Sequence, residues 1–150
     1  MTIGGCAYEC LDYTINDFGV YPVKYPKTNK DKCLGCGRCP EVCKTKAITI
    51  EDKLAVIDEN VCRGCGKCFD HCPNDAKDIK FEGYQIYVGG RGVRGLVEGC
   101  PVEVDTEEEV LDTLNKVLDL MKKYSVNSYE RLSTVMKRVG KEKFMEELNY

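Results

Sequence analysis

The chain has 150 residues, of which 31 % are charged, and a formal net charge of −3 at pH 7. This length fits one domain, or a small domain with a second module built into it. The weakly acidic balance argues against a surface for nucleic acid or anionic membrane, and no apolar stretch approaches the roughly 18–20 residues that span a bilayer. We therefore expect neither nucleic-acid binding nor membrane insertion.

Cysteine is unusually frequent, with 11 residues in the chain. Such a number can indicate a disulfide scaffold in a secreted protein. The count is odd, however, and eight of the cysteines fall in two tight runs. The first six residues also lack the basic and apolar regions of a signal peptide. We therefore expect a soluble, cytoplasmic protein with reduced cysteines.

The first predicted strand lies within residues 15–25, where residues 19–23 are strand-like but contain a proline. An internal repeat follows. Residues 33–43 carry four cysteines at C-x2-C-x2-C-x3-C spacing, and residues 62–72 repeat this pattern at an offset of 29. Duplication of a small half-domain explains the repeat. Between the two runs, residues 47–57 predict a β-hairpin with a polar turn, so we expect residues 27–80 to form a self-contained unit.

The cysteine spacing indicates two [4Fe–4S] clusters of the bacterial ferredoxin type. Three thiolates of one run can wrap a cube, but a continuous loop cannot reach the fourth iron. In two-cluster ferredoxins the fourth cysteine of each run therefore ligates the other cluster. The predicted ligands of cluster 1 are Cys33, Cys36, Cys39 and Cys72, and those of cluster 2 are Cys62, Cys65, Cys68 and Cys43.

A pair of four-cysteine zinc sites is the alternative for these runs. Zinc sites usually pair two C-x2-C knuckles and need no third and fourth cysteine at this spacing. Glycines within both runs also permit the tight turns that wrapping a cube requires. Pro73 after Cys72 matches the usual ending of such a run, whereas Lys44 follows Cys43. We favour iron–sulfur clusters and expect His71 to be a loop residue, not a ligand.

Beyond the second run, residues 84–88 predict a strand that leads into a glycine-rich basic loop at residues 89–95. Residues 106–109 match a capping box that opens a helix. We expect this helix to bury an apolar stripe of Val110, Leu111, Leu114, Val117, Leu118 and Met121.

Two further helical segments are predicted near the C-terminus. One runs from about residue 128 to 139, with Leu132, Val135 and Met136 facing inward and Gly140 as its C-cap. The last is a turn of helix that holds Phe144, Met145 and Leu148. Ordinary core packing explains these apolar residues.

Both flanks of the cysteine repeat resemble siroheme sulfite and nitrite reductases. Cys6 and Cys10, followed by residues 16–20 (NDFGV), look like a cysteine pair of that family and its N-D-[IF]-G stretch. Residues 83–92 resemble its strand and glycine-rich loop, and the C-terminal helices resemble its closing elements.

In small anaerobic and in dissimilatory members of that family, a ferredoxin domain is inserted at this point of the chain. The resemblance therefore implies an α+β fold and an anaerobic setting. The ferredoxin-type module of residues 27–80 would be inserted into a truncated, discontinuous sulfite-reductase-like domain, formed by residues 1–26 plus 81–150 and closed by C-terminal helices.

The resemblance leaves three interpretations of the remaining cysteines open. The family holds its siroheme-linked cluster with a second, upstream cysteine pair, which no residue before Met1 supplies. Cys6 and Cys10 are therefore relics without a ligand role, or ligands of a third cluster completed by Cys100 or by another chain, or part of a working siroheme site. By the same resemblance, Arg91 and Arg94 are anion contacts near siroheme; otherwise they are arginines of a solvated turn.

The expected function is electron transfer through two [4Fe–4S] clusters, as a carrier or as a subunit of a larger anaerobic redox complex. One alternative is a catalytic or remnant subunit of a siroheme reductase acting on sulfite or nitrite. Another is a structural iron–sulfur subunit. We predict no catalytic residue, no siroheme in this chain and no enzyme activity of the chain alone, with a redox protein or a larger oxidoreductase complex as its partner.

Overall fold

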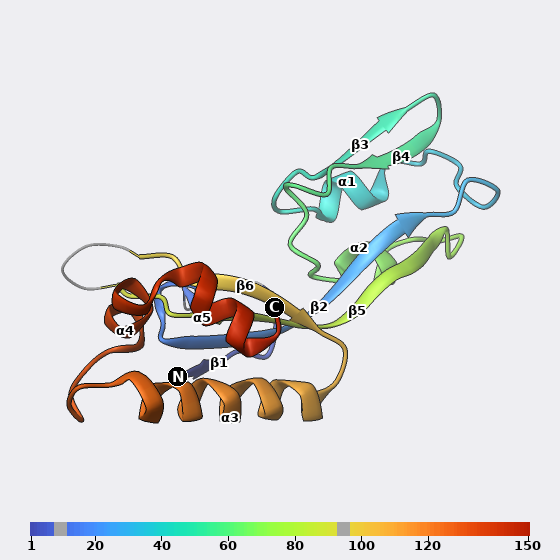
Figure 1. Ribbon diagram of the computed structural model, residues 1–150. Helices are drawn as coiled ribbons and strands as arrows, with labels where there is room; N and C mark the ends of the chain where they lie inside the picture. The colour runs from blue at the N-terminus through green and yellow to red at the C-terminus, as the bar shows by residue number, and fades with distance from the viewer. Residues whose placement is uncertain (8–11, 93–96) are drawn as a thin grey trace. The chain divides into compact units, whose positions relative to one another are not determined.

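The computed structural model describes residues 1–7, 12–92 and 97–150, and its fold is mixed α+β, as the sequence predicts. Its contacts divide the chain into two compact units (Figure 1). Unit 1 comprises Met1–Gly5, residues 12–22 and Gly83–Tyr150. Unit 2 comprises Val23–Glu82 together with Cys6 and Ala7. The boundaries predicted at residues 27 and 80 stay a prediction.

A four-stranded sheet with the order β1-β2-β5-β6 organises unit 1. Its strands are β1 (Thr2–Ile3), β2 (Phe18–Thr28), β5 (Lys77–Val88) and β6 (Cys100–Val104). β1 pairs with β2 in parallel, and β5 pairs with β6 in antiparallel register from Tyr84↔Val104 to Val88↔Cys100. The strand expected within residues 15–25 is present as β2, which is longer than predicted and continues through Pro22. β1 pairs only as far as Val20, so the edge beyond it tolerates a residue without an N–H group.

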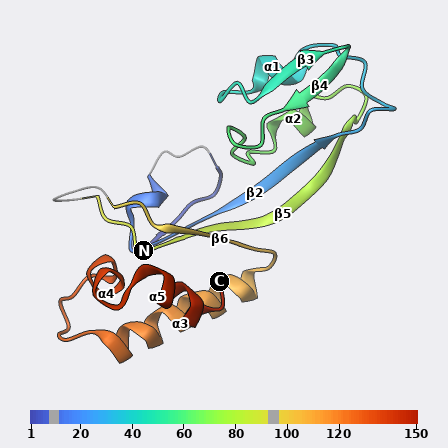
Figure 2. The same ribbon diagram turned by 45° about the horizontal axis from the view of Figure 1, so that its top comes forward.

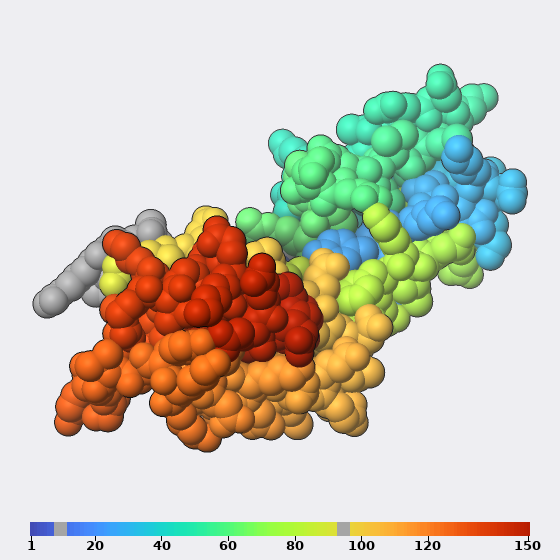
Figure 3. Space-filling model, viewed as in Figure 1, coloured from blue at the N-terminus to red at the C-terminus, as the bar shows by residue number. Residues whose placement is uncertain are grey.

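Three helices cover the sheet of unit 1: α3 (Glu107–Tyr124), α4 (Leu132–Val139) and α5 (Lys141–Leu148). Their atoms form one continuous surface in the space-filling view (Figure 3). A short 3-10 turn, η1 (Tyr13–Ile15), precedes β2. The apolar core between sheet and helices consists of Phe18, Val20, Ile86, Val88, Cys100, Val102, Val104, Val117, Leu120, Leu132, Val135, Met136, Phe144 and Leu148.

The N-terminus of α3 is the predicted capping box. The Thr106 hydroxyl accepts a hydrogen bond from the Glu109 backbone N–H, and the Glu109 carboxylate accepts one from the Thr106 N–H, both at 3.3 Å. The predicted stripe of this helix is partly wrong, because Leu111 and Leu118 are 59 % and 48 % exposed. These two residues are seven positions apart and share a flank of the helix, whereas its buried face is centred on Val117 and Leu120.

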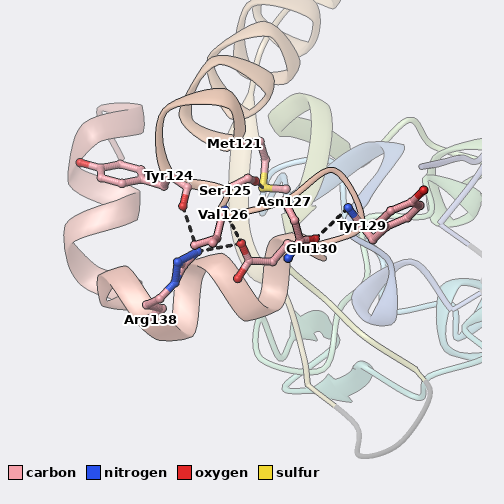
Figure 4. Close-up of polar contacts among 8 residues, drawn as sticks. All are labelled: Met121, Tyr124, Ser125, Val126, Asn127, Tyr129, Glu130 and Arg138. Atoms are coloured by element: carbon pink, nitrogen blue, oxygen red, sulfur yellow. Dashed lines mark hydrogen bonds and ion pairs between the residues drawn. The ribbon is translucent and has the colours of Figure 1, made fainter.

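α4 begins at Leu132, not near residue 128 as predicted, because side chains hold the preceding residues in a loop (Figure 4). The Glu130 carboxylate accepts hydrogen bonds from the Val126 N–H at 2.9 Å and from the Arg138 guanidinium at 2.8 Å. Asn127 accepts one from the Tyr129 N–H at 3.0 Å. The predicted inward residues of α4 are buried, and Gly140 is its C-cap with φ 102°.

In unit 2, the predicted hairpin is present as β3 (Ile48–Glu51) and β4 (Leu54–Ile57), with Ile48 paired to Ile57. Asp52 and Lys53 have positive φ angles and form its tight turn. Two short helices, α1 (Arg38–Val42) and α2 (Lys67–Asp70), lie beside the hairpin (Figure 2). The sequence interpretation did not include them, because each is only about one turn long.

The two halves of unit 2 repeat their backbone hydrogen bonds at the offset of 29 found in the sequence. Asn29 N–H donates to the Ala76 carbonyl at 3.0 Å, and Asp58 N–H donates to the Ala47 carbonyl at 2.8 Å. The N–H groups of the first cysteine of each run donate to the carbonyls of Asn29 and Asp58 in the same way. The sequence repeat is therefore also a structural repeat.

Candidate metal centre

Four cysteines from both runs surround one pocket of unit 2. About 330 Å³ of space, part of it open to solvent, lies within this pocket. Its lining consists of Cys33, Leu34, Gly35, Cys36, Arg38, Cys39, Ile50, Ala55, Cys72, Pro73, Asn74, Ala76 and Lys77. Cys72, the last cysteine of the second run, thus lies with the first three cysteines of the other run.

The other four predicted ligands also lie near one another. Burial raises the pKa of Cys62, and the negative charges of Cys65 and Cys43 raise it further. Burial likewise raises the pKa of Cys68 to about 11, and Cys62 and Cys65 contribute in the same direction. Cys43, the last cysteine of the first run, therefore helps to raise the pKa of Cys62, the first cysteine of the second run.

The two groups of cysteines meet in a small apolar core. Cys39 and Cys68 are buried together with Ile48 and Ala55, and the charge of Cys39 is among those that raise the pKa of Cys68. Apolar side chains thus connect the two groups of cysteines.

Left-handed glycines shape both cysteine loops. Gly35 and Gly64 have φ angles of 64° and 63°, and Gly37 and Gly66 have φ angles of 83° and 74° at the starts of α1 and α2. A side chain at Gly35 would lie 2.6 Å from the carbonyl oxygen of Lys53 in the hairpin turn. Glycine is therefore required at this position both for its backbone conformation and for its close packing.

Backbone N–H groups point at the sulfur atoms, as the predicted cluster chemistry requires. The Cys72 sulfur accepts a hydrogen bond from the Ala76 N–H at 3.2 Å. Although burial alone would raise the pKa of Cys33, the N–H groups of Gly35 and Ala55 and the charge of Lys77 lower it. Burial raises the pKa of Cys39, against the opposing charge of Lys77. N–H groups and one lysine thus favour the thiolate form of Cys33, whereas burial outweighs the lysine at Cys39.

The donor set fits an iron–sulfur cube. Its thiolates, N–H groups and wrapping loops are those that [4Fe–4S] clusters use. Among the described residues, no three His, Cys, Asp or Glu side chains lie close enough to bind a single metal ion. The ligands of a cube stand farther apart than those of one ion, because the cube is larger.

Comparison with known proteins places the chain in a family. A sequence model of the "Nitrite and sulphite reductase 4Fe-4S domain" matches residues 1–150. The chain belongs to this family. Membership supports an iron–sulfur cluster in this chain and agrees with the resemblance seen in its flanks.

Two relatives are much longer than this chain. It is 47 % identical, over 149 residues, to a protein of Methanocaldococcus jannaschii named coenzyme F420-dependent sulfite reductase, and covers 99 % of its own length but 24 % of that protein. A crystal structure of dissimilatory sulfite reductase I shares its fold, with a TM-score of 0.62 at 22 % identity, over 98 % of this chain and 41 % of that one. The chain therefore spans about a quarter to two fifths of the length of these relatives.

The three cysteines outside the two runs differ in their surroundings. Cys6 is exposed, and Cys10 lies outside the described residues. Cys100 is buried in the core of unit 1, where burial raises the pKa of its thiol and Lys141 opposes that effect. A third cluster that uses these cysteines stays a prediction.

Of the two arginines predicted in the glycine-rich loop, Arg91 lies among the residues that the structure describes. Arg91 exchanges two backbone hydrogen bonds with Val97, at 2.8 and 2.9 Å. Its buried Nε atom has no hydrogen-bond partner among the described residues. Arg94 lies outside them.

The ring of the predicted loop residue His71 contacts the Lys67 carbonyl at 3.0 Å. In the described ranges, no helix is long and apolar enough to cross a membrane.

Sequence reasoning did not single out the charged residue Lys77 of the pocket lining. Lys77 begins β5, lines the pocket and is buried. The internal repeat could have indicated this residue, because Lys77 aligns with an apolar residue, Ile48, at the offset of 29.

Proposed function

We propose that this chain relays electrons through two [4Fe–4S] clusters that are bound in a ferredoxin-type module inserted into its sulfite-reductase-like domain. Cys33, Cys36, Cys39 and Cys72 bind the first cluster, and Cys62, Cys65, Cys68 and Cys43 bind the second. The chain acts as a carrier or within a larger anaerobic redox complex, and its partner is a redox protein.

One observation carries this proposal: the pocket that joins Cys72 to the first three cysteines of the other run. A ligand set that crosses between the two runs is the arrangement of two-cluster ferredoxins. It is not expected of a pair of independent zinc knuckles, each built from neighbouring cysteines.

Exposure of the first site supports electron exchange with a partner. Cys36 is exposed beside Leu34, whose side chain is 70 % exposed. A partner that docks here would bring its own redox group close to the first site. The buried neighbours Cys39 and Cys68 would then pass the electron to the second site.

Metal content tests the proposal. Protein purified without oxygen should contain about eight irons per chain, the number for two cubes. A value near twelve would indicate a third cluster at Cys6, Cys10 and Cys100. Zinc without iron, after anaerobic expression, would refute the proposal.

Sulfite or nitrite reduction is the second candidate function, and the similarity to the F420-dependent sulfite reductase favours it. In this case the chain would contribute its clusters to a siroheme-containing enzyme and would receive electrons that come from reduced coenzyme F420. A visible spectrum separates the two candidates, since siroheme adds sharp bands to the broad absorbance of iron–sulfur clusters.

A further inference from the structure

Lys77 is the one buried charged side chain among the described residues, with 8 % of its surface exposed. Its Nζ atom donates a hydrogen bond to the Thr28 hydroxyl at 2.9 Å. Burial of a lysine is costly unless its charge is compensated. The pocket that it lines offers that compensation in the form of thiolates.

The repeat shows that this lysine replaces an apolar residue. At the offset of 29, Lys77 corresponds to Ile48 and Thr28 corresponds to Ile57. Ile48 and Ile57 pair with each other in the hairpin, and Ile48 is buried beside the cysteines. One half of unit 2 therefore uses an apolar pair where the other uses a hydrogen-bonded lysine and threonine. Packing alone does not require the charge, because the same position is filled without it.

The charge of Lys77 acts on cysteines of both groups, but its position is at the first group. It opposes the effect of burial on the pKa of Cys39 and helps to lower that of Cys33, both in the first ligand set. In the second set it acts on Cys68. Lys77 lines the pocket of the first set.

We propose that Lys77 raises the reduction potential of the site formed by Cys33, Cys36, Cys39 and Cys72 above that of the second site, so that the first site holds the electron preferentially. This inference rests on the two-cluster function proposed above. Reduction adds one electron to a site that is already negative, with no bond made or broken, and a fixed positive charge nearby favours the added electron.

Coulomb's law gives the size of the effect. A unit charge about 10 Å away, at an effective dielectric constant of about 20, changes a one-electron equilibrium by about tenfold or somewhat more. Because the charge also acts on the second site, the difference that it creates between the two sites is smaller than this change, but its sign gives electron flow through the module a preferred direction.

The test is a redox titration of the holoprotein with dithionite as reductant, followed by EPR. The double variant Lys77→Ile with Thr28→Ile installs the apolar pair that the other half already uses. We expect the higher-potential step to fall, with about a tenfold lower ratio of reduced to oxidised site at a fixed potential, or about 59 mV. The two steps should move closer together. Lys77→Arg, which keeps the charge, should change the ratio less than about twofold.

A matched control removes a positive charge from the same strand. Lys80 pairs with Glu59 at 2.6 Å, and both side chains are largely exposed. Lys80→Met should leave the potentials nearly unchanged, since solvent screens an exposed charge. Equal shifts in Lys80→Met and in the double variant, or no shift in either, would overturn the inference.

Two further results separate this inference from the proposed function. If the double variant does not incorporate iron, Lys77→Gln removes the charge while keeping a hydrogen-bond donor. Failure of both variants to bind iron would assign Lys77 to cluster assembly and overturn its role in tuning. Absence of clusters from the unaltered protein would instead refute the proposed function.

Discussion

Cys43 and Cys72 each end one cysteine run, yet lie with cysteines of the other run. Replacing Cys43 with Ala should therefore damage the site of Cys62, Cys65 and Cys68 and spare the other site. We expect about half of the iron to be lost and the EPR coupling between two reduced clusters to disappear.

The matched variant Cys72→Ala should have the reciprocal effect, because Cys72 belongs to the pocket of the first run. Iron analysis and EPR of both variants distinguish the two sites. If Cys43→Ala instead removed the cluster of its own run, the crossed assignment would be wrong.

At Gly35, conformation and space both exclude a side chain. Gly35→Ala places a Cβ atom 2.6 Å from the Lys53 carbonyl oxygen and forces alanine into a left-handed conformation with φ 64°. Gly37 has φ 83° but open space around it, so Gly37→Ala carries the conformational cost alone, about 1–2 kcal/mol. We expect Gly35→Ala to shorten the half-life of the clusters in denaturant clearly more than Gly37→Ala. Absorbance in the visible range measures this, and equal half-lives would contradict the close packing of hairpin and loop.

At the scale of secondary-structure elements, the core of unit 1 depends on α5, whose Leu148 is fully buried. Leu148→Ala should cost about 2–5 kcal/mol, because it removes buried apolar surface and leaves a cavity. Leu111→Ala on the exposed flank of α3 is the matched control and should change stability by no more than about 0.5 kcal/mol. Urea unfolding followed by circular dichroism measures both. Similar midpoints for the two variants would show that α5 does not pack as described.

At the scale of the whole molecule, we expect this chain alone to reduce neither sulfite nor nitrite. Six-electron reduction of an oxyanion needs siroheme, a cluster linked to it, and cationic groups that stabilise the departing oxygens. By resemblance, these 150 residues offer towards such a site only Cys6, Cys10, Arg91 and Arg94, and the chain spans 24 % of the sulfite reductase that it is similar to.

Reduced viologen with sulfite or nitrite is the assay, before and after addition of siroheme. Activity that appears only when a second protein chain is added would agree with electron delivery. Turnover that follows bound siroheme and is lost in Cys10→Ala would favour the second candidate function.

Local patterns determined much of what was predictable. The capping box of α3, the hairpin of β3 and β4, and the cap at Gly140 follow from a few neighbouring residues, and the structure confirms them. The start of α4 was not predictable, because the Glu130 carboxylate that accepts a hydrogen bond from the Val126 N–H is itself held by Arg138, near the far end of α4. The exposure of Leu111 and Leu118 on α3 was not predicted, because helical periodicity indicates which side of a helix is apolar but not how much of that side is buried.

The sequence by itself determined the repeat, the cysteine spacing and the family resemblance, because these are properties of residue order and short-range geometry. The tertiary structure decided how Cys72, whose place beside the first run the spacing predicted, reaches that pocket, since residues far apart in the chain come together only through folding. It also decided that Lys77 is buried beside thiolates, because burial depends on what other elements bring against a side chain. A lysine at the start of a strand is ordinarily solvated, and only the alignment of Lys77 with Ile48 in the repeat, not its neighbours along the chain, distinguishes it from Lys80.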